Sequence, residues 1–241
     1  MKTVFITGAS GGIGGASAQL FYQNGYNVAM TYFSNIQNLN KITADFNKDR
    51  ILAVKCDVGD KLSVNNAIAE TLSKFGTIDV LVNNAGIAQQ KPFADISEKD
   101  WDNMFKVNVK GMYNCTKAVI DTMINKKSGS IINISSMWGE TGASCEVHYS
   151  AAKAAIIGFT KALAKEMGLS GIRVNCVTPG VINTQMNKNL TDGDIKELIY
   201  ETPLNRIGTP YDIANTVLYL ASDKASFITG QIIGVNGGFV I

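Results

Sequence analysis

The chain has 241 residues, of which 46% are hydrophobic, and its 22 basic and 20 acidic side chains give a formal net charge of +2. A chain of this size can bury one substantial core, and no low-complexity linker divides it, so we expect a single domain over residues 1–241. The charges are scattered and the apolar runs are short, which argues against a nucleic-acid partner and against a membrane-spanning segment.

The first residues and the cysteines indicate where the protein works. Met1 is followed almost at once by the apolar run TVFIT, which leaves no room for a signal peptide, so we expect a cytoplasmic protein. The cysteines are far apart and form no Cys-x-x-Cys pair, so we expect reduced thiols and no metal site. They are Cys56, Cys115, Cys145 and Cys176.

Short β-rich runs alternate with helix-length segments along the chain. The predicted strands are Thr3–Thr7, Asn27–Thr31, Ile51–Cys56, Ile78–Asn83, Ser130–Ser135, Arg173–Val177 and Gln231–Val235. The predicted helices include Ala16–Gln23, Leu62–Phe75, Glu98–Asn125 and Tyr149–Met167. Parallel strands need crossover helices, and runs such as VLVN have no polar face. The pattern therefore predicts a doubly wound α/β fold, with a seven-stranded parallel sheet and helices on both faces.

The first predicted strand runs directly into the glycine-rich segment TGASGGIG. Gly8, Gly12 and Gly14 permit a tight turn and a close approach of the backbone to a phosphate. The helix that follows offers unpaired N–H groups at its N-terminus. The segment favours a dinucleotide site, and the alternative is an ordinary turn from strand to helix.

Tyr149 and Lys153 are four residues apart in YSAAK and therefore lie on one face of the predicted helix. A phenol with a pKa near ~10 is a weak acid at neutral pH, and a nearby ammonium group favours its ionised form. Ser136, in SSMWG, precedes Tyr149 by thirteen positions. The pair predicts a proton-transfer role, although each residue also has an ordinary structural explanation.

Several further motifs occur in order along almost the whole chain. They are NNAG at 83–86, KVNVKG with Asn108, SSMWG, YSAAK, the Pro179-Gly180 pair and NGG at 236–238. Together with the glycine segment they resemble the short-chain dehydrogenase/reductase family, and most of all its bacterial 3-oxoacyl-[acyl-carrier-protein] reductases. The resemblance implies a Rossmann-type fold and NADPH-dependent reduction of a 3-oxoacyl thioester to the 3-hydroxyacyl thioester.

The resemblance also implies four catalytic residues. Tyr149 would donate a proton to the carbonyl oxygen, and Lys153 would lower the pKa of Tyr149 and bind the ribose hydroxyls of the nicotinamide nucleotide. Ser136 would orient the substrate oxygen. Asn108 would kink its helix and hold water in a proton relay.

Cofactor-binding residues follow from the same resemblance and from the glycine segment. The expected set is Gly8, Ser10, Gly12, Ile13, Gly14, Ser34, Asn35, Asp57, Val58, Asn84, Ala85, Gly86, Tyr149, Lys153, Pro179, Gly180, Ile182 and Thr184. Asp57 would accept a hydrogen bond from the adenine amino group, and its alternative role is a strand-end cap.

The end of the second predicted strand decides between the two nicotinamide cofactors. Residues 31–35 contain no carboxylate that would repel a 2′-phosphate, which favours NADP(H). Gly11 stands where many NADP-using relatives carry a basic residue. Ser10, Ser34 and Asn35 can still donate hydrogen bonds to the phosphate.

The substrate's carrier remains open at this point. Carrier-protein reductases of this family dock acyl carrier protein through two basic positions; Lys127 matches the first, but Ser170 stands at the second. Lys165 and Arg173 lie close enough in sequence to compensate. A coenzyme A thioester such as acetoacetyl-CoA or a free ketone is the alternative substrate. A dinucleotide-binding sensor or scaffold is the alternative that is not an enzyme.

Three further expectations concern parts outside the catalytic group. The polar segment that follows the sixth predicted strand, residues 181–207, is expected to form a substrate lid. The resemblance implies a homotetramer, in which long helices form an interface. His148, the only histidine, is expected to pack at the surface or an interface and to take no part in catalysis.

Overall fold

A computed structural model of the protein describes residues 1–188 and 190–241. Within these residues one seven-stranded parallel sheet has the order β3-β2-β1-β4-β5-β6-β7, which confirms the predicted doubly wound fold. The strands are β1 (Thr3–Ile6), β2 (Asn27–Tyr32), β3 (Ile51–Lys55), β4 (Val80–Asn83), β5 (Gly129–Ile134), β6 (Ile172–Pro179) and β7 (Ile232–Val235). The strand order reverses between β1 and β4, and ligands of such sheets bind beyond the carboxyl ends at this point.

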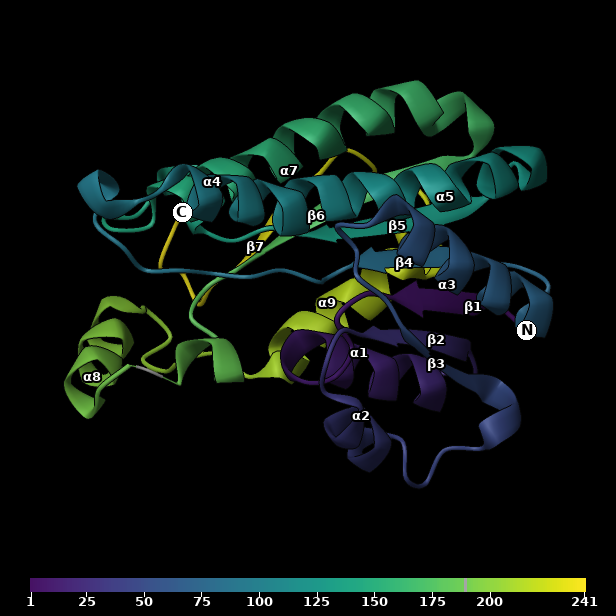
Figure 1. The fold of residues 1–241 in the computed structure, drawn as a ribbon, viewed down its shortest axis with the longest axis horizontal. Coiled ribbons are helices and arrows are strands. Elements are labelled where there is room, and N and C mark those ends of the chain that lie inside the picture. Colours follow the sequence, from purple (N-terminus) through teal and green to yellow (C-terminus); the bar gives the residue numbers. More distant parts are fainter. Residues whose placement is uncertain (189) are drawn as a thin grey trace.

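Helices cover both faces of the sheet (Figure 1). One face carries α3 (Lys61–Phe75), α5 (Gly111–Lys126) and α7 (Val147–Met167). The other face carries α1 (Gly12–Gln23), α2 (Ile36–Ile42) and α9 (Pro210–Ala221). Toward the carboxyl ends of the strands lie α4 (Glu98–Phe105), α6 (Trp138–Thr141) and α8 (Asp192–Glu201). In Figure 1, α4 and α8 lie beyond the arrowheads on opposite sides of the sheet.

The central strands are buried on both faces because their alternate residues serve two different cores. In β1, Val4 and Ile6 pack against Phe21 of α1, whereas Phe5 packs in the core under α5. Burying one large apolar side chain stabilises a fold by about 1.5–3 kcal/mol. A strand without a polar face is therefore stable only between two layers of helices, as its sequence indicates.

Buried amides fix the position of α7 on the sheet. Asn83 Nδ2 in β4 donates to Asn133 Oδ1 in β5 at 2.9 Å, and Asn133 Nδ2 donates to Thr160 Oγ1 in α7 at 2.9 Å. A shift of α7 along the sheet would leave these polar groups buried without partners. The ladder therefore sets the register of α7, which carries Tyr149 and Lys153.

The helix expected over Glu98–Asn125 is interrupted. It begins with a capping box of Ser97 and Asp100, but a π-helical turn, Lys106–Lys110, separates α4 from α5. The wider turn frees backbone groups, and Asn108 Nδ2 donates to the carbonyl oxygen of Met104 at 3.1 Å. The expected kink at Asn108 therefore takes the form of a π turn.

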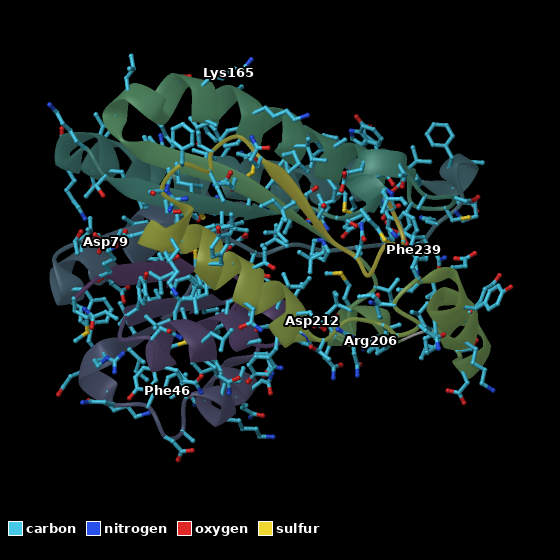
Figure 2. All side chains as sticks on the ribbon, turned by 180° about the vertical axis from the view of Figure 1, so that it is seen from behind. Phe46, Asp79, Lys165, Arg206, Asp212 and Phe239 are labelled. Carbon is cyan, nitrogen blue, oxygen red and sulfur yellow. The ribbon has the colours of Figure 1, made fainter. Side chains whose placement is uncertain are left out.

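Helix α9 was not among the predicted elements. Its start is marked by a capping box between Thr209 and Asp212, with Pro210 in the first turn. Arg206 and Asp212 lie next to each other there (Figure 2), with Nη1 2.8 Å from Oδ2 and Nη2 2.9 Å from Oδ1. The helix covers the face of the sheet that also carries α1.

Residues 181–207, the expected lid, contain a short 3-10 helix (Gln185–Asn187) and α8. Residue 189 of this segment lies outside the described residues. A β-bridge between Ile182 and Gly208 joins the two ends of the segment. None of the helices described over residues 1–188 and 190–241 is long and apolar enough to span a membrane.

Candidate active site

The four residues expected to be catalytic are all buried beyond the carboxyl ends of β4 and β5. Tyr149 and Lys153 lie one turn apart on α7, with Lys153 Nζ 5.6 Å from the centroid of the Tyr149 ring. A Cβ atom placed on Gly86 would lie 2.6 Å from Asn108 Oδ1 and 3.4 Å from Lys153 Nζ. The backbone of the NNAG segment therefore meets Asn108 and Lys153 at one point.

Hydrogen bonds fix the end of β5 against the catalytic helix. Lys153 Nζ donates to the carbonyl oxygen of Ile134 at 3.0 Å, and Ser135 Oγ donates to the carbonyl oxygen of Lys153 at 2.7 Å. Two residues further along, the backbone N–H of Met137 donates to the carbonyl oxygen of Pro179 at 3.0 Å. Ser136 is thus held between α7 and the end of β6.

Burial controls the protonation of the two central groups. It raises the pKa of Tyr149 to about 12, with the Ser136 hydroxyl opposing the shift and Glu146 adding to it. Burial also lowers the pKa of Lys153 to about 8. Desolvation of the phenol is the largest effect on the pKa of Tyr149, and the Lys153 ammonium group donates to the carbonyl oxygen of Ile134, so the expected lowering of that pKa by Lys153 remains a prediction.

The glycine loop forms a cradle that fits a pyrophosphate. Gly8 has a φ of +66°, and a Cβ atom on Gly14 would lie 2.5 Å from both the carbonyl oxygen of Gly8 and Asn84 Nδ2. No side chain caps the N-terminus of α1, and its first turn contains no acidic residue. The N–H groups there are consequently available to an anion. Thr184 lies over the same loop, with Cγ2 3.2 Å from the Cβ position of Gly12.

Thr7 joins this loop to the NNAG segment, a role that the sequence analysis missed. Its Oγ1 accepts hydrogen bonds from the backbone N–H of Asn84 at 3.0 Å and of Ala85 at 2.9 Å. Asn84 Nδ2 in turn donates to the carbonyl oxygens of Thr7 and Gly8. A hydroxyl directly before the first glycine was the available signal in the sequence.

Asn38 is a second residue that the sequence analysis missed. Asn35 caps α2 by accepting from the backbone N–H of Asn38 at 3.0 Å, and Asn38 Nδ2 donates to the carbonyl oxygen of Ser10. A Cβ atom on Gly11 would lie 2.9 Å from that nitrogen. Asn38 therefore fills the space where a basic side chain of the glycine loop would begin. Ser34 is exposed beside it.

The remaining cofactor candidates support the walls of the site. Asp57 Oδ1 accepts from the backbone N–H of Gly59 at 2.9 Å, so this residue does cap the end of its strand. The carbonyl oxygen of Val58 accepts from Asn114 Nδ2 at 2.9 Å. Ile13 and Ile182 pack in the core under α1 and α9. The backbone N–H of Gly180 donates to the carbonyl oxygen of Val235 at 3.1 Å. Their contact with a cofactor remains a prediction.

The expectation for His148 is wrong, whereas that for Arg173 remains a prediction. The guanidinium group of Arg173 donates to the carbonyl oxygens of Ile228 at 3.3 Å and Ser222 at 3.2 Å, and it keeps the charge by which it would compensate for Ser170. His148 does not lie at the surface: its side chain is fully buried. Lys127 and Lys165 are exposed, and Figure 2 labels Lys165 on α7.

Comparison with known proteins agrees with this geometry. The family described as enoyl-(acyl carrier protein) reductase matches residues 8–240. The fold and site define an oxidoreductase of the Rossmann type, and the chain belongs to the short-chain dehydrogenase/reductase family.

Individual relatives match over nearly their full length. A 3-oxoacyl-[acyl-carrier-protein] reductase FabG of Staphylococcus aureus strain Mu50 is 41% identical, covering 98% of this chain and 97% of its own. The FabG of Chlamydia trachomatis serovar D is 42% identical over 98% and 96% of the two chains. Among solved structures, a glucose/ribitol dehydrogenase-type member of the family from Brucella melitensis superposes with a TM-score of 0.93, at 36% identity over 100% and 97%. NADP-bound ElxO gives 0.92, at 34% identity over 99% and 98%.

Proposed function

We propose that the protein reduces a 3-oxoacyl thioester, carried on acyl carrier protein, to the 3-hydroxyacyl thioester with NADPH. The observation that carries this proposal is the buried group of Ser136, Tyr149 and Lys153, with Asn108 beside it, next to a glycine cradle that fits a pyrophosphate. Two relatives that match over nearly the full length are 3-oxoacyl-[acyl-carrier-protein] reductases.

Each catalytic residue has one task in this reaction. NADPH, when bound, supplies the hydride that the carbonyl carbon accepts. Tyr149 gives its phenolic proton to the carbonyl oxygen, which balances the reduction to an alcohol. Ser136 donates a hydrogen bond to the same oxygen, and the charged Lys153 stabilises the tyrosinate that remains. Asn108 lies in the π turn, from which water would return a proton to this group.

The cofactor assignment rests on the end of β2 and the residues after it. Residues 31–35 have no carboxylate to repel a 2′-phosphate, and NADP is the nucleotide bound in the similar structure of ElxO. Asn38, which is tied to Ser10, adds an amide beside the loop. We expect kcat/KM to be higher with NADPH than with NADH, and a preference for NADH would contradict the assignment.

The Arg173 guanidinium group donates to two carbonyl oxygens, which leaves fewer of its N–H groups for an acidic carrier protein. Lys165 is sixteen residues beyond Tyr149 on α7, which corresponds to about 24 Å of helix. Acetoacetyl-CoA or a free ketone is therefore the second candidate substrate. The decisive test follows NADPH absorbance with acetoacetyl-acyl carrier protein, acetoacetyl-CoA, a free 3-oxo ester and a trans-2-enoyl thioester side by side.

The expected order of kcat/KM is carrier protein above coenzyme A above free ester. Equal rates on all three 3-oxo compounds would remove acyl carrier protein as the partner. Reduction of the enoyl thioester alone would replace the proposed reaction, in line with the family's description. If NADPH binds and no compound is reduced, the protein is a dinucleotide-binding sensor or scaffold.

We further propose that residues 181–207 form a substrate lid on a single cytoplasmic domain. Among its described residues, α8 has none that is buried, and the bridge between Ile182 and Gly208 marks where the segment joins the body. Limited proteolysis within α8 should slow when NADPH and substrate analogue are added. We also propose that the protein is a homotetramer in which the long helices form an interface. The mass of the protein in solution tests this proposal.

A further inference from the structure

His148 directly precedes the catalytic tyrosine on α7 and is fully buried, yet the proposed chemistry does not use it. Its Nε2 lies 2.9 Å from Oε1 of Gln89 in the loop that follows β4. The amide of Gln89 is oriented by Asp100, because Gln89 Nε2 donates to Asp100 Oδ1 at 3.3 Å. Oε1 must then accept, so the imidazole carries its proton on Nε2.

The other imidazole nitrogen shows that this histidine is neutral. Nδ1 is buried and has no hydrogen-bond partner among the described residues. Protonation of Nδ1 would create a buried charge with an unpaired donor. Burial accordingly lowers the pKa of His148, and the charged groups that act on it, Asp100 and Lys91, have opposite effects. His148 is therefore a fixed hydrogen-bond donor at neutral pH.

The chain of bonds continues from Gln89 to the start of α4. Asp100 Oδ2 accepts from Lys91 Nζ at 2.8 Å and completes the capping box with Ser97. The backbone N–H of Lys91 donates to the carbonyl oxygen of Cys145 at 2.6 Å, just before α7. The loop 87–91 is thus attached both to α4 and to the N-terminal end of the catalytic helix.

The same loop touches the catalytic group at its other end. Both backbone polar groups of Ile87 are bonded to Asn108, at 3.0 Å and 3.3 Å. The Ile87 side chain packs in one apolar cluster with Tyr149 and Met104. The loop begins directly after the NNAG segment, so it lies between the expected cofactor site and the first turn of α4.

We propose that His148 and Gln89 are a pair of positioning residues that hold the loop 87–91 in place as one wall of the substrate site. The pair touches no reacting atom. It acts on the reaction through Ile87, which packs against the cluster that contains Tyr149 and whose position depends on the loop. This inference rests on the proposed carbonyl reduction, and it assigns a role to the one histidine of the chain.

Two substitutions at His148 separate hydrogen bonding from packing. His148→Leu removes the donor, whereas in His148→Gln the side-chain amide can place an N–H near the position of Nε2. With acetoacetyl-acyl carrier protein we expect kcat/KM to fall about tenfold in His148→Leu, mainly through a higher KM, and to recover to within about threefold of wild type in His148→Gln. The Kd for NADPH, measured by fluorescence, should stay within about twofold in both variants, since neither His148 nor Gln89 is among the expected cofactor-binding residues.

Hydrogen exchange tests the same idea without a substrate. Amides 87–91 should exchange faster in His148→Leu than in wild type, and at wild-type rates in His148→Gln. If His148→Leu does not fold, Gln89→Met removes the acceptor at similar length and should give the same two effects. The double variant His148→Leu/Gln89→Met should lose no more than Gln89→Met alone, because that single variant already removes the bond to His148 together with the bond to Asp100.

Several results would overturn the proposal. One is unchanged kcat and KM in His148→Leu; another is no rescue by His148→Gln. Unchanged exchange at residues 87–91 would contradict the anchoring itself. Failure of the wild-type protein to reduce any carbonyl compound would refute the proposed function instead, and faster exchange in His148→Leu would then still support the anchoring of the loop.

Discussion

Asn108 bonds both backbone polar groups of Ile87: its Nδ2 donates to the carbonyl oxygen at 3.0 Å, and its Oδ1 accepts from the N–H at 3.3 Å. A regular α-helix lacks the widened turn that holds Asn108 in this position. The π turn Lys106–Lys110 widens the backbone around Asn108, and the amide is buried facing the loop after β4. One interrupted helix thereby joins the NNAG segment to the catalytic group.

Replacing Asn108 by leucine should cost both stability and activity. The substitution leaves the part-buried N–H and C=O of Ile87 and the buried carbonyl oxygen of Met104 without the Asn108 amide, so we expect a loss of about 2–4 kcal/mol in the free energy of unfolding, measured by urea denaturation. Asn175→Leu is the matched control, because Asn175 is also fully buried and also bonds a loop twice, to Ile228 and Gln231. The control should lose similar stability and keep its kcat; equal losses of kcat in the two variants would refute a specific role for Asn108.

Replacing Tyr149 by phenylalanine should remove turnover and leave the fold intact. The side chain is buried, so the ring volume is kept and only the proton donor is lost. We expect kcat to fall by about 10²–10⁴-fold with an unchanged Kd for NADPH, measured by steady-state kinetics and fluorescence titration. Turnover close to that of wild type would mean that another group supplies the proton.

Stability at alkaline pH should report the buried ammonium group. The pKa of Lys153 is about 8 in the fold, below its ordinary value of 10.5. Between these pH values the unfolded state binds more protons, so the contribution of Lys153 to the free energy of unfolding rises with pH. Unfolding of wild type and Lys153→Met should be compared at several points from pH 8 to 10.5. The difference, wild type minus variant, should increase across this range, and a constant or falling difference would contradict the lowered pKa.

The glycine cradle should not tolerate a methyl group. A Cβ atom on Gly14 would lie 2.5 Å from the carbonyl oxygen of Gly8, so Gly14→Ala should displace the loop and weaken NADPH binding by at least about tenfold. Gly158→Ala is the control, since that glycine lies within α7 with nothing within 4 Å of its Cβ position. The control should bind NADPH normally and gain about 0.5–1 kcal/mol in stability. Tight binding by Gly14→Ala would show that the pyrophosphate lies elsewhere.

The local sequence predicted those features that depend on neighbours along the chain. Strands such as Val80–Asn83 were recognisable because both faces are apolar. Tyr149 and Lys153 were recognisable as a pair because helical geometry alone puts them on one face. The alternation of strand-like and helix-length segments predicted the doubly wound sheet, which the strand order confirms.

Other features depend on residues that are distant in sequence. The environment of His148 depends on Gln89, which is 59 positions away. The hydrogen bonds of the Arg173 guanidinium group depend on Ser222 and Ile228. The sequence by itself determined the fold class and the reactive side chains, because repeat spacing and helix pitch are local properties. Only the tertiary structure decided the protonation of Tyr149 and Lys153 and the anchoring of the loop 87–91, because burial and hydrogen-bond partners are set by how distant segments pack.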